Sequence, residues 1–139
     1  MTDNTNDKFK FTHDTLMAFM QGLSTMADEE AIKKNKDYAV IGDGSTGLSN
    51  FYATAEIVGN TPMQVLWSHM LKHDFAIEKM LRGEELHSEP IVGRIIDKIN
   101  YLKLALALYI EQSQDSGGLD VLKGVIGEIG GNTNTSGQG

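Results

Sequence analysis

Apolar residues recur at three- and four-residue spacings along most of the chain, the period that gathers them on one face of an α-helix. The first stripe follows Thr12, a residue type that caps helix N-termini. It consists of Leu16, Phe19, Met20, Leu23 and Met26. The acidic run at residues 28–30 predicts either a further turn of this helix or a short separate helix that ends near residue 36.

Glycines and one capping motif predict the next boundaries. Residues 41–47 are too glycine-rich for regular structure and predict a loop, and residues 48–58 predict a short helix closed by Gly59. Thr61, Pro62 and Gln64 then form a capping-box pattern, with proline at the first helical position. The helix that follows is predicted to end near Gly83, and its stripe is Leu66, Met70, His73, Ile77 and Met80.

The last long helix is predicted to open at residues 88–90. From Val92 to Tyr109 it is apolar almost all round, which predicts a central, buried helix. Residues 119–129 favour one more short helix, and neither an internal repeat nor an alternating strand pattern stands out. We therefore expect an all-α fold, a compact bundle of four to five helices over residues 12–129. Residues 1–11 and 130–139 are expected to form flexible tails.

Composition narrows the functional classes. The 139 residues suit one domain, and 12 basic against 19 acidic side chains give a net charge of −7. That balance argues against stable nucleic-acid binding, but not against a small nucleotide, because divalent ions bind both carboxylates and phosphates. The chain has no cysteine, no signal-like apolar run and no stretch of the roughly 20 apolar residues needed to span a bilayer. These features predict a soluble, cytoplasmic protein without membrane attachment.

Asp97 and Asn100 are the first candidates for chemistry. They lie three residues apart on one face of the helix expected to be buried, so both need partners. Glu89 lies eight residues earlier on roughly the same face, and the three residues would suit Mg²⁺, which prefers oxygen ligands. The alternative is a structural polar network between packed helices.

A second group of polar residues lies on the preceding helix. Asp74 and Glu78, four residues apart, would complete a carboxylate cluster if they faced Asp97, and Lys72 would neutralise a phosphate. The alternative is that this acidic pair faces solvent. His69 and His73 have the spacing of two helical metal ligands, but no glutamate follows His69, so the HExxH motif of zinc proteases is absent. The pair His73-Asp74 with Asp97 also resembles the metal-binding pattern of HD phosphohydrolases.

Read in order, three segments resemble the phage nucleotide-modification-associated domain family, which is grouped with MazG-like all-α nucleotide pyrophosphohydrolases. They are Lys34-Asn35-Lys36-Asp37-Tyr38, Leu48-Ser49-Asn50-Phe51, and Asp97-Lys98-Ile99-Asn100-Tyr101 with Ser88-Glu89 before it. The resemblance covers about residues 30–110. It implies a helical bundle that forms dimers or tetramers and acts on nucleotides. The chain departs from the family at Gly93, where an acidic residue is usual, and lacks the paired glutamates of true MazG enzymes.

The resemblance also implies roles for individual residues. Glu89 and Asp97 would be catalytic and would hold Mg²⁺ with the help of Asp74 or Glu78. Substrate would be bound by Asn100, Lys72, Asp37, Asn50 and Tyr101.

Three functional hypotheses follow. The first is Mg²⁺-dependent hydrolysis of a nucleoside triphosphate to monophosphate and pyrophosphate, in the host cell cytoplasm if the source is a phage. The second is a non-catalytic nucleotide-binding protein, which the loss of an acid at Gly93 favours. The third is a phage factor that binds a host protein through its helical faces.

Overall fold

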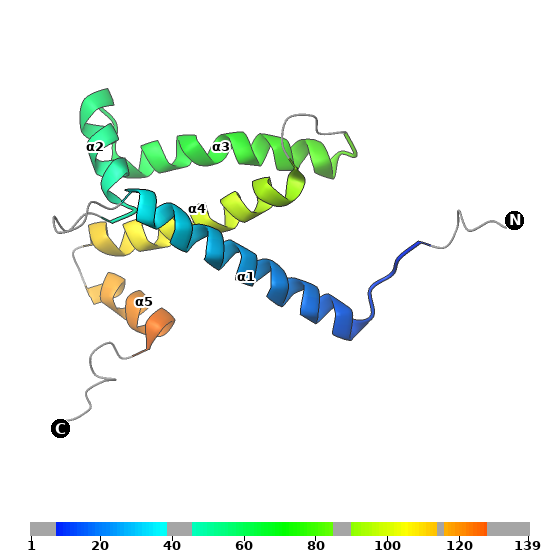
Figure 1. Ribbon diagram of the computed structural model, residues 1–139. Helices are drawn as coiled ribbons and strands as arrows, with labels where there is room; N and C mark the ends of the chain where they lie inside the picture. Colours follow the sequence, from blue (N-terminus) through cyan, green and yellow to red (C-terminus); the bar gives the residue numbers. More distant parts are fainter. Residues whose placement is uncertain (1–7, 39–45, 85–89, 114–115, 128–139) are drawn as a thin grey trace, which may run out of the picture.

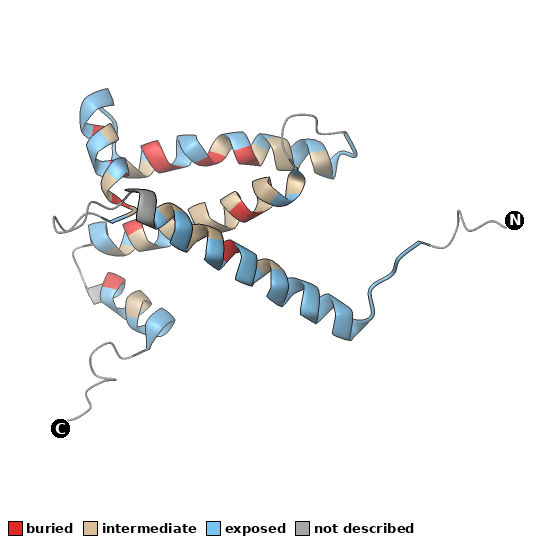
Figure 2. Ribbon diagram, viewed as in Figure 1, coloured by how far each residue is buried: buried red, intermediate tan, exposed pale blue. Residues whose placement is uncertain are grey.

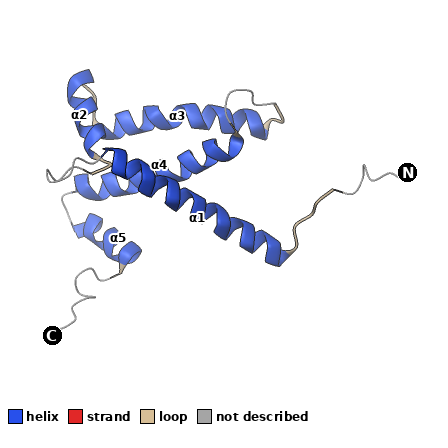
Figure 3. Ribbon diagram, in the orientation of Figure 1, coloured by secondary structure: helices blue, strands red, loops and turns tan. Residues whose placement is uncertain are grey.

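The computed structural model describes residues 8–38, 46–84, 90–113 and 116–127. Within these ranges the chain is all-α, as predicted, and forms five helices without a strand (Figures 1 and 3). The helices are α1 (His13–Tyr38), α2 (Ser49–Val58), α3 (Pro62–Leu81), α4 (Ile91–Ser113) and α5 (Ser116–Ile126). None of these helices is long and apolar enough to cross a membrane.

Helix α4 is the centre of the arrangement, because it contacts α3, α1 and α5. It runs antiparallel to α3, since Asp74 meets Lys98 near one end of the pair and Leu66 packs with Leu108 near the other. The short helix α2 packs against α3, and α1 crosses α4 from the other side (Figure 1).

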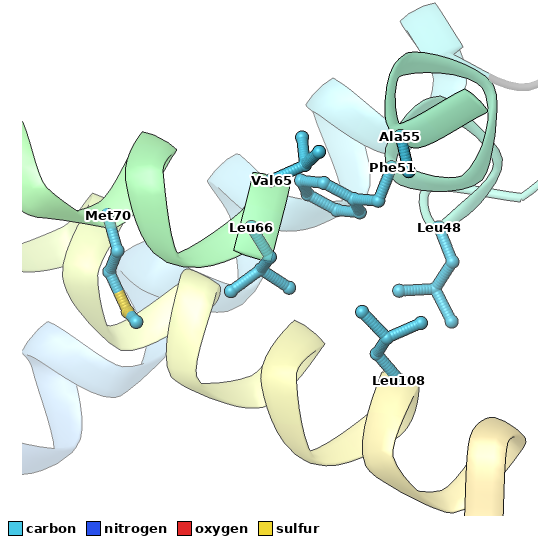
Figure 4. Close-up of a cluster of buried hydrophobic side chains, with 7 residues drawn as sticks. All are labelled: Leu48, Phe51, Ala55, Val65, Leu66, Met70 and Leu108. Atoms are coloured by element: carbon cyan, nitrogen blue, oxygen red, sulfur yellow. The ribbon is translucent and has the colours of Figure 1, made fainter. Parts of the chain in front are cut away.

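The core lies where α2, α3 and the C-terminal half of α4 meet (Figure 4). Leu66 and Leu108 are fully buried there, and each contributes about 1.5–3 kcal/mol by leaving water. The other members of the cluster are Leu48, Phe51, Ala55, Val65 and Met70. This cluster holds α2 against α3. It thereby also holds in place the side chains of α2 that line the cavity described below.

The predicted capping signals are confirmed. The hydroxyl of Thr61 accepts a hydrogen bond from the Gln64 backbone N–H at 3.1 Å, and the Gln64 side-chain oxygen accepts one from the Thr61 N–H at 2.9 Å. Gly59 ends α2 at φ 78° and Gly83 follows α3 at φ 81°, a left-handed conformation in which a Cβ is strained. The boundaries of α2 and α3 are therefore properties of the local sequence.

Of the two alternatives for the acidic run at residues 28–30, the further turn of the first helix is confirmed, because α1 continues without a break from His13 to Tyr38. Two other expectations change. Helix α4 is central, but it is not buried all round: Leu102, Leu106 and Tyr109 are 42–51% exposed, because the other described helices cover only part of its circumference (Figure 2). Helix α5 begins at Ser116, three residues earlier than expected.

Candidate functional site

A cavity of about 220 Å³ lies where α1, α2, α3 and α4 come together. Its size exceeds the roughly 150 Å³ of a cavity that holds a benzene ring, and it falls just below the roughly 300 Å³ at which sites for drug-sized ligands begin. One aromatic heterocycle therefore fits inside. The lining residues are Ala31, Lys34 and Asn35 of α1; Gly47, Asn50, Phe51 and Thr54 from α2 and the turn before it; His69 of α3; and Asp97, Asn100, Tyr101, Lys103 and Leu104 of α4.

Asn100 is the polar anchor of this cavity. Its side-chain Nδ2 donates a hydrogen bond of 2.9 Å to the backbone oxygen of Ala27, which ties α4 to α1. Its Oδ1 is buried and has no hydrogen-bond partner among the residues that the structure describes. A buried acceptor without a partner costs about 1–3 kcal/mol, so such atoms are rare in folded proteins. The structure thus leaves this oxygen unsatisfied and shut off from solvent, in a residue that lines the cavity.

Aromatic rings line the same cavity. The rings of His69 and Tyr101 are nearly parallel, with an interplanar angle of 2° and centroids 6.4 Å apart. Phe51 lies edge-on to His69 at 6.1 Å. Rings held by packing in this way offer flat apolar surface against which a planar ligand can stack.

The charged side chains at the cavity are paired with one another or with close neighbours. Lys34 Nζ donates to Asp97 Oδ1 at 3.0 Å, and Lys103 Nζ donates to Asp28 Oδ1 at 2.7 Å. Lys34 remains 44% exposed at its side chain and Asp97 22% exposed. The two lysines therefore sit at the mouth of the cavity rather than inside it, where an anionic group outside the cavity can reach them.

Gly47 brings the turn before α2 close to α1. A Cβ at this position would lie 2.8 Å from Oδ1 of Asn35, which is too close for the Asn35 side chain to stay where it is. The absence of a side chain at Gly47 thus allows the Asn35 amide to line the cavity.

Asp97 is further held by a chain of side chains from α3 and α4. The guanidinium of Arg94 lies 3.4 Å from Nδ1 of His73, which is only 3% exposed, and Nε2 of His73 lies 3.7 Å from Asp97 Oδ2. Because a guanidinium can only donate, a hydrogen bond here requires Nδ1 as the acceptor, which places the ring proton on Nε2, on the side of Asp97. The protein partners expected of Asp97 and Asn100 in a polar network are thus present, and Asn100 Oδ1 is an atom that this network leaves without a partner among the described residues.

The structure brings together four of the predicted site residues and leaves the others elsewhere. Asn50, Asp97, Asn100 and Tyr101 all line the cavity. Lys72 is exposed on α3 and is not part of the lining. Glu89 and the side chain of Asp37 lie outside the described residues.

The predicted carboxylate cluster is not assembled in the described part of the chain. No group of three or more histidine, aspartate or glutamate side chains there lies close enough to hold a metal ion. Asp74 bonds to Lys98, and Glu78 bonds to Arg82 at 3.0 Å and is 60% exposed at its side chain, so each acid is satisfied by a nearby cation. The described residues therefore hold no site with three such ligands for Mg²⁺.

Asp97 and Lys34 also line a second, more polar cavity of about 490 Å³. Its other polar residues are Glu29, Glu30 and Lys33 of α1. Asp97 therefore stands at the junction of a small aromatic cavity and a larger charged one.

Sequence reasoning gave no binding role to Lys34, Asn35, Thr54, His69 or Lys103, all of which line the first cavity. A signal existed for three of them: Lys34 and Asn35 belong to the first motif of the family resemblance, and His69 lies one turn before His73. Thr54 and Lys103 gave none, because their place depends on how α2 and α1 pack against α4.

Comparisons with known proteins found no match to this chain among family models, curated proteins or solved structures.

Proposed function

We propose that the aromatic cavity binds a nucleotide, with the base inside and the phosphates outside. The observation that carries the proposal is a cavity the size of one heterocycle, lined by the rings of His69 and Tyr101 and by Asn100, whose buried Oδ1 has no partner among the described residues. Adenine, guanine and cytosine carry amino groups that would donate to this acceptor. The rings of Tyr101 and His69 would stack on the base, an interaction worth about 1–3 kcal/mol per base in single-stranded nucleic-acid sites.

The second cavity would have to take the remainder of such a ligand. It adjoins the first at Asp97 and Lys34, which line both, and its wall holds the ammonium groups of Lys33 and Lys34 beside three carboxylates, those of Glu29, Glu30 and Asp97. Lysine ammonium groups bind phosphates as point charges. A phosphate there would compete with Asp97 for Lys34, so binding is expected to weaken with added salt.

Mg²⁺-dependent hydrolysis of a nucleoside triphosphate to monophosphate and pyrophosphate is the second candidate. The family resemblance and the position of Asp97 at the junction of the two cavities favour it. Mg²⁺ commonly binds through only one or two carboxylates together with the phosphates of the substrate, so the proposal rests on Asp97 and on Glu89. We further propose a cytoplasmic location, where nucleotides are available as free metabolites.

Calorimetric titration of the pure protein tests the binding proposal. The ligands are the common ribo- and deoxyribonucleoside mono- and triphosphates, with Mg²⁺ or with EDTA, and chromatography of each mixture detects hydrolysis. Binding of an amino-bearing base without product supports the first candidate, and Mg²⁺-dependent monophosphate with pyrophosphate establishes the second. Absence of both in a folded protein overturns the two proposals and redirects the search to a host-protein partner.

A matched pair of variants on α2 locates the site. Thr54→Leu adds bulk to the cavity wall, whereas Ala53→Leu adds bulk to the exposed side of the same helix. We expect Thr54→Leu to weaken nucleotide binding about tenfold or more and Ala53→Leu to leave it unchanged. Equal effects of both changes would contradict the placement of the base.

A further inference from the structure

The charges on the wall of the second cavity limit what its occupant can carry. The two ammonium groups and three carboxylates of this wall leave one negative charge in excess. The remaining described residues of the wall, which carry no charge, are Met26, Gly93 and Ile96. An anionic ligand that enters this cavity therefore meets more charges of its own sign than of the opposite sign.

The two ammonium groups of this wall are not equally available. Nζ of Lys34 lies 3.0 Å from Oδ1 of Asp97 and 3.8 Å from Oε2 of Glu30, so two of the three carboxylates already hold it. Lys33 is exposed and forms no ion pair with any residue that the structure describes. The same holds for the third carboxylate, that of Glu29. Lys33 can therefore meet an anion without giving up a partner, whereas Lys34 cannot.

The other cations around the two cavities are engaged with neighbouring side chains. Arg94 contacts His73 of α3, and Lys98 contacts Asp74 of the same helix. Neither of these cations lines either cavity. Lys103 lines the first cavity, but its Nζ donates a hydrogen bond of 2.7 Å to a carboxylate of α1. The described part of the chain thus offers an incoming anion one ammonium group that is not already paired.

We propose that the site takes a nucleoside monophosphate in preference to the triphosphate of the same nucleoside. The inference rests on the proposed function, in which the base lies in the aromatic cavity and the phosphates lie in the second one. A single phosphate there meets Lys33 and competes for Lys34. A second and a third phosphate add negative charge beside Glu29 and Glu30, and like charges brought together at a binding site lower the affinity. The net charge of −7 on the whole chain acts in the same direction.

Calorimetric titration in EDTA with a nucleoside, its monophosphate and its triphosphate tests this preference. EDTA is required because a divalent ion neutralises part of the triphosphate charge. We expect the monophosphate to bind at least as tightly as the nucleoside and about fivefold or more tightly than the triphosphate. A triphosphate that binds as tightly as the monophosphate overturns this inference and leaves the nucleotide proposal standing. Absence of binding by all three ligands overturns both.

Two pairs of variants with the same change of charge locate the preference on this wall. Glu29→Gln removes an unpaired carboxylate from the wall, and Glu56→Gln removes an exposed carboxylate from α2. We expect Glu29→Gln to tighten triphosphate binding severalfold and Glu56→Gln to leave it unchanged. Lys33→Gln is expected to weaken monophosphate binding severalfold without a change in nucleoside binding, whereas Lys79→Gln, at an exposed position of α3, is expected to change neither. Equal effects within either pair overturn the inference.

Discussion

Replacing Asn100 by leucine separates a ligand-binding role from a structural one. Leucine has nearly the shape of asparagine, but it lacks both the Nδ2 donor and the Oδ1 acceptor. In the structure the donor makes a 2.9 Å bond to Ala27, while the acceptor is buried and has no partner among the described residues. The change therefore removes one satisfied polar group and one unsatisfied polar group from the contact between α1 and α4.

The two losses act on stability in opposite directions. Loss of the hydrogen bond to Ala27 is expected to destabilise the fold by about 0.5–1.5 kcal/mol, and removal of the unpaired acceptor to stabilise it by about 1–3 kcal/mol. The net change in the free energy of unfolding lies between a loss of about 0.5 and a gain of about 2.5 kcal/mol. For a domain of this size, each kcal/mol shifts the melting temperature by roughly 4 °C. The Asn100→Leu protein is thus expected to melt from about 2 °C below to about 10 °C above the natural chain.

Nucleotide binding, by contrast, is expected to weaken in the Asn100→Leu protein. A base whose amino group loses its buried acceptor is left with an unsatisfied donor, which costs about 1–3 kcal/mol and weakens binding about 10- to 100-fold. Thermal unfolding and calorimetric titration of the same preparation give both numbers. A melting temperature more than about 8 °C lower would show that the Oδ1 atom has a structural partner. Unchanged nucleotide affinity would remove Asn100 from the site.

Two further changes test the local account of stability. Thr61→Ala removes the capping box of α3 and is expected to lower the free energy of unfolding by about 1 kcal/mol; a denaturant midpoint equal to that of the natural chain would contradict the cap. Desolvation by burial, followed by its hydrogen bond of 2.9 Å to Glu111, raises the pKa of Tyr52 above its ordinary value of about 10. The folded state thus holds the phenol proton more tightly than the unfolded state, so this contribution to stability is complete below about pH 10 and is lost as the pH rises toward the folded-state pKa. Tyr52→Phe is expected to reduce that alkaline loss of stability, and identical pH profiles of the two proteins would refute it.

Much of the fold is predictable because its signals are local. The capping box at Thr61 and the left-handed glycine at Gly59 depend on residues within one turn, so the sequence alone places the boundary between α2 and α3. The burial of α4 was overestimated for the opposite reason. The sequence of α4 shows that most of its circumference is apolar, but which part is covered depends on how the other helices pack. Leu102 and Tyr109 therefore remain about half exposed although they are apolar.

In the candidate site, too, the features set by local sequence were predictable, and those set by packing between helices were not. Asp97 and Asn100 were identified because polar residues in an apolar helix need partners, and both have them. The predicted cluster with Asp74 and Glu78 required knowledge of side-chain pairing across helices, and Lys98 and Arg82 take these acids instead. Helical spacing reports which residues share a face; it does not report which charge on the neighbouring helix will meet them.

The most direct test of the central claim is a nuclear magnetic resonance titration of the protein, labelled at asparagine and tyrosine, with adenosine, guanosine, cytidine and thymidine monophosphates. The account predicts saturable shifts of the Asn100 side-chain amide and of the Tyr101 ring, largest for a base that carries an amino group. Saturable shifts confined to residues outside the aromatic cavity, or the absence of any saturable shift with all four nucleotides, would contradict it.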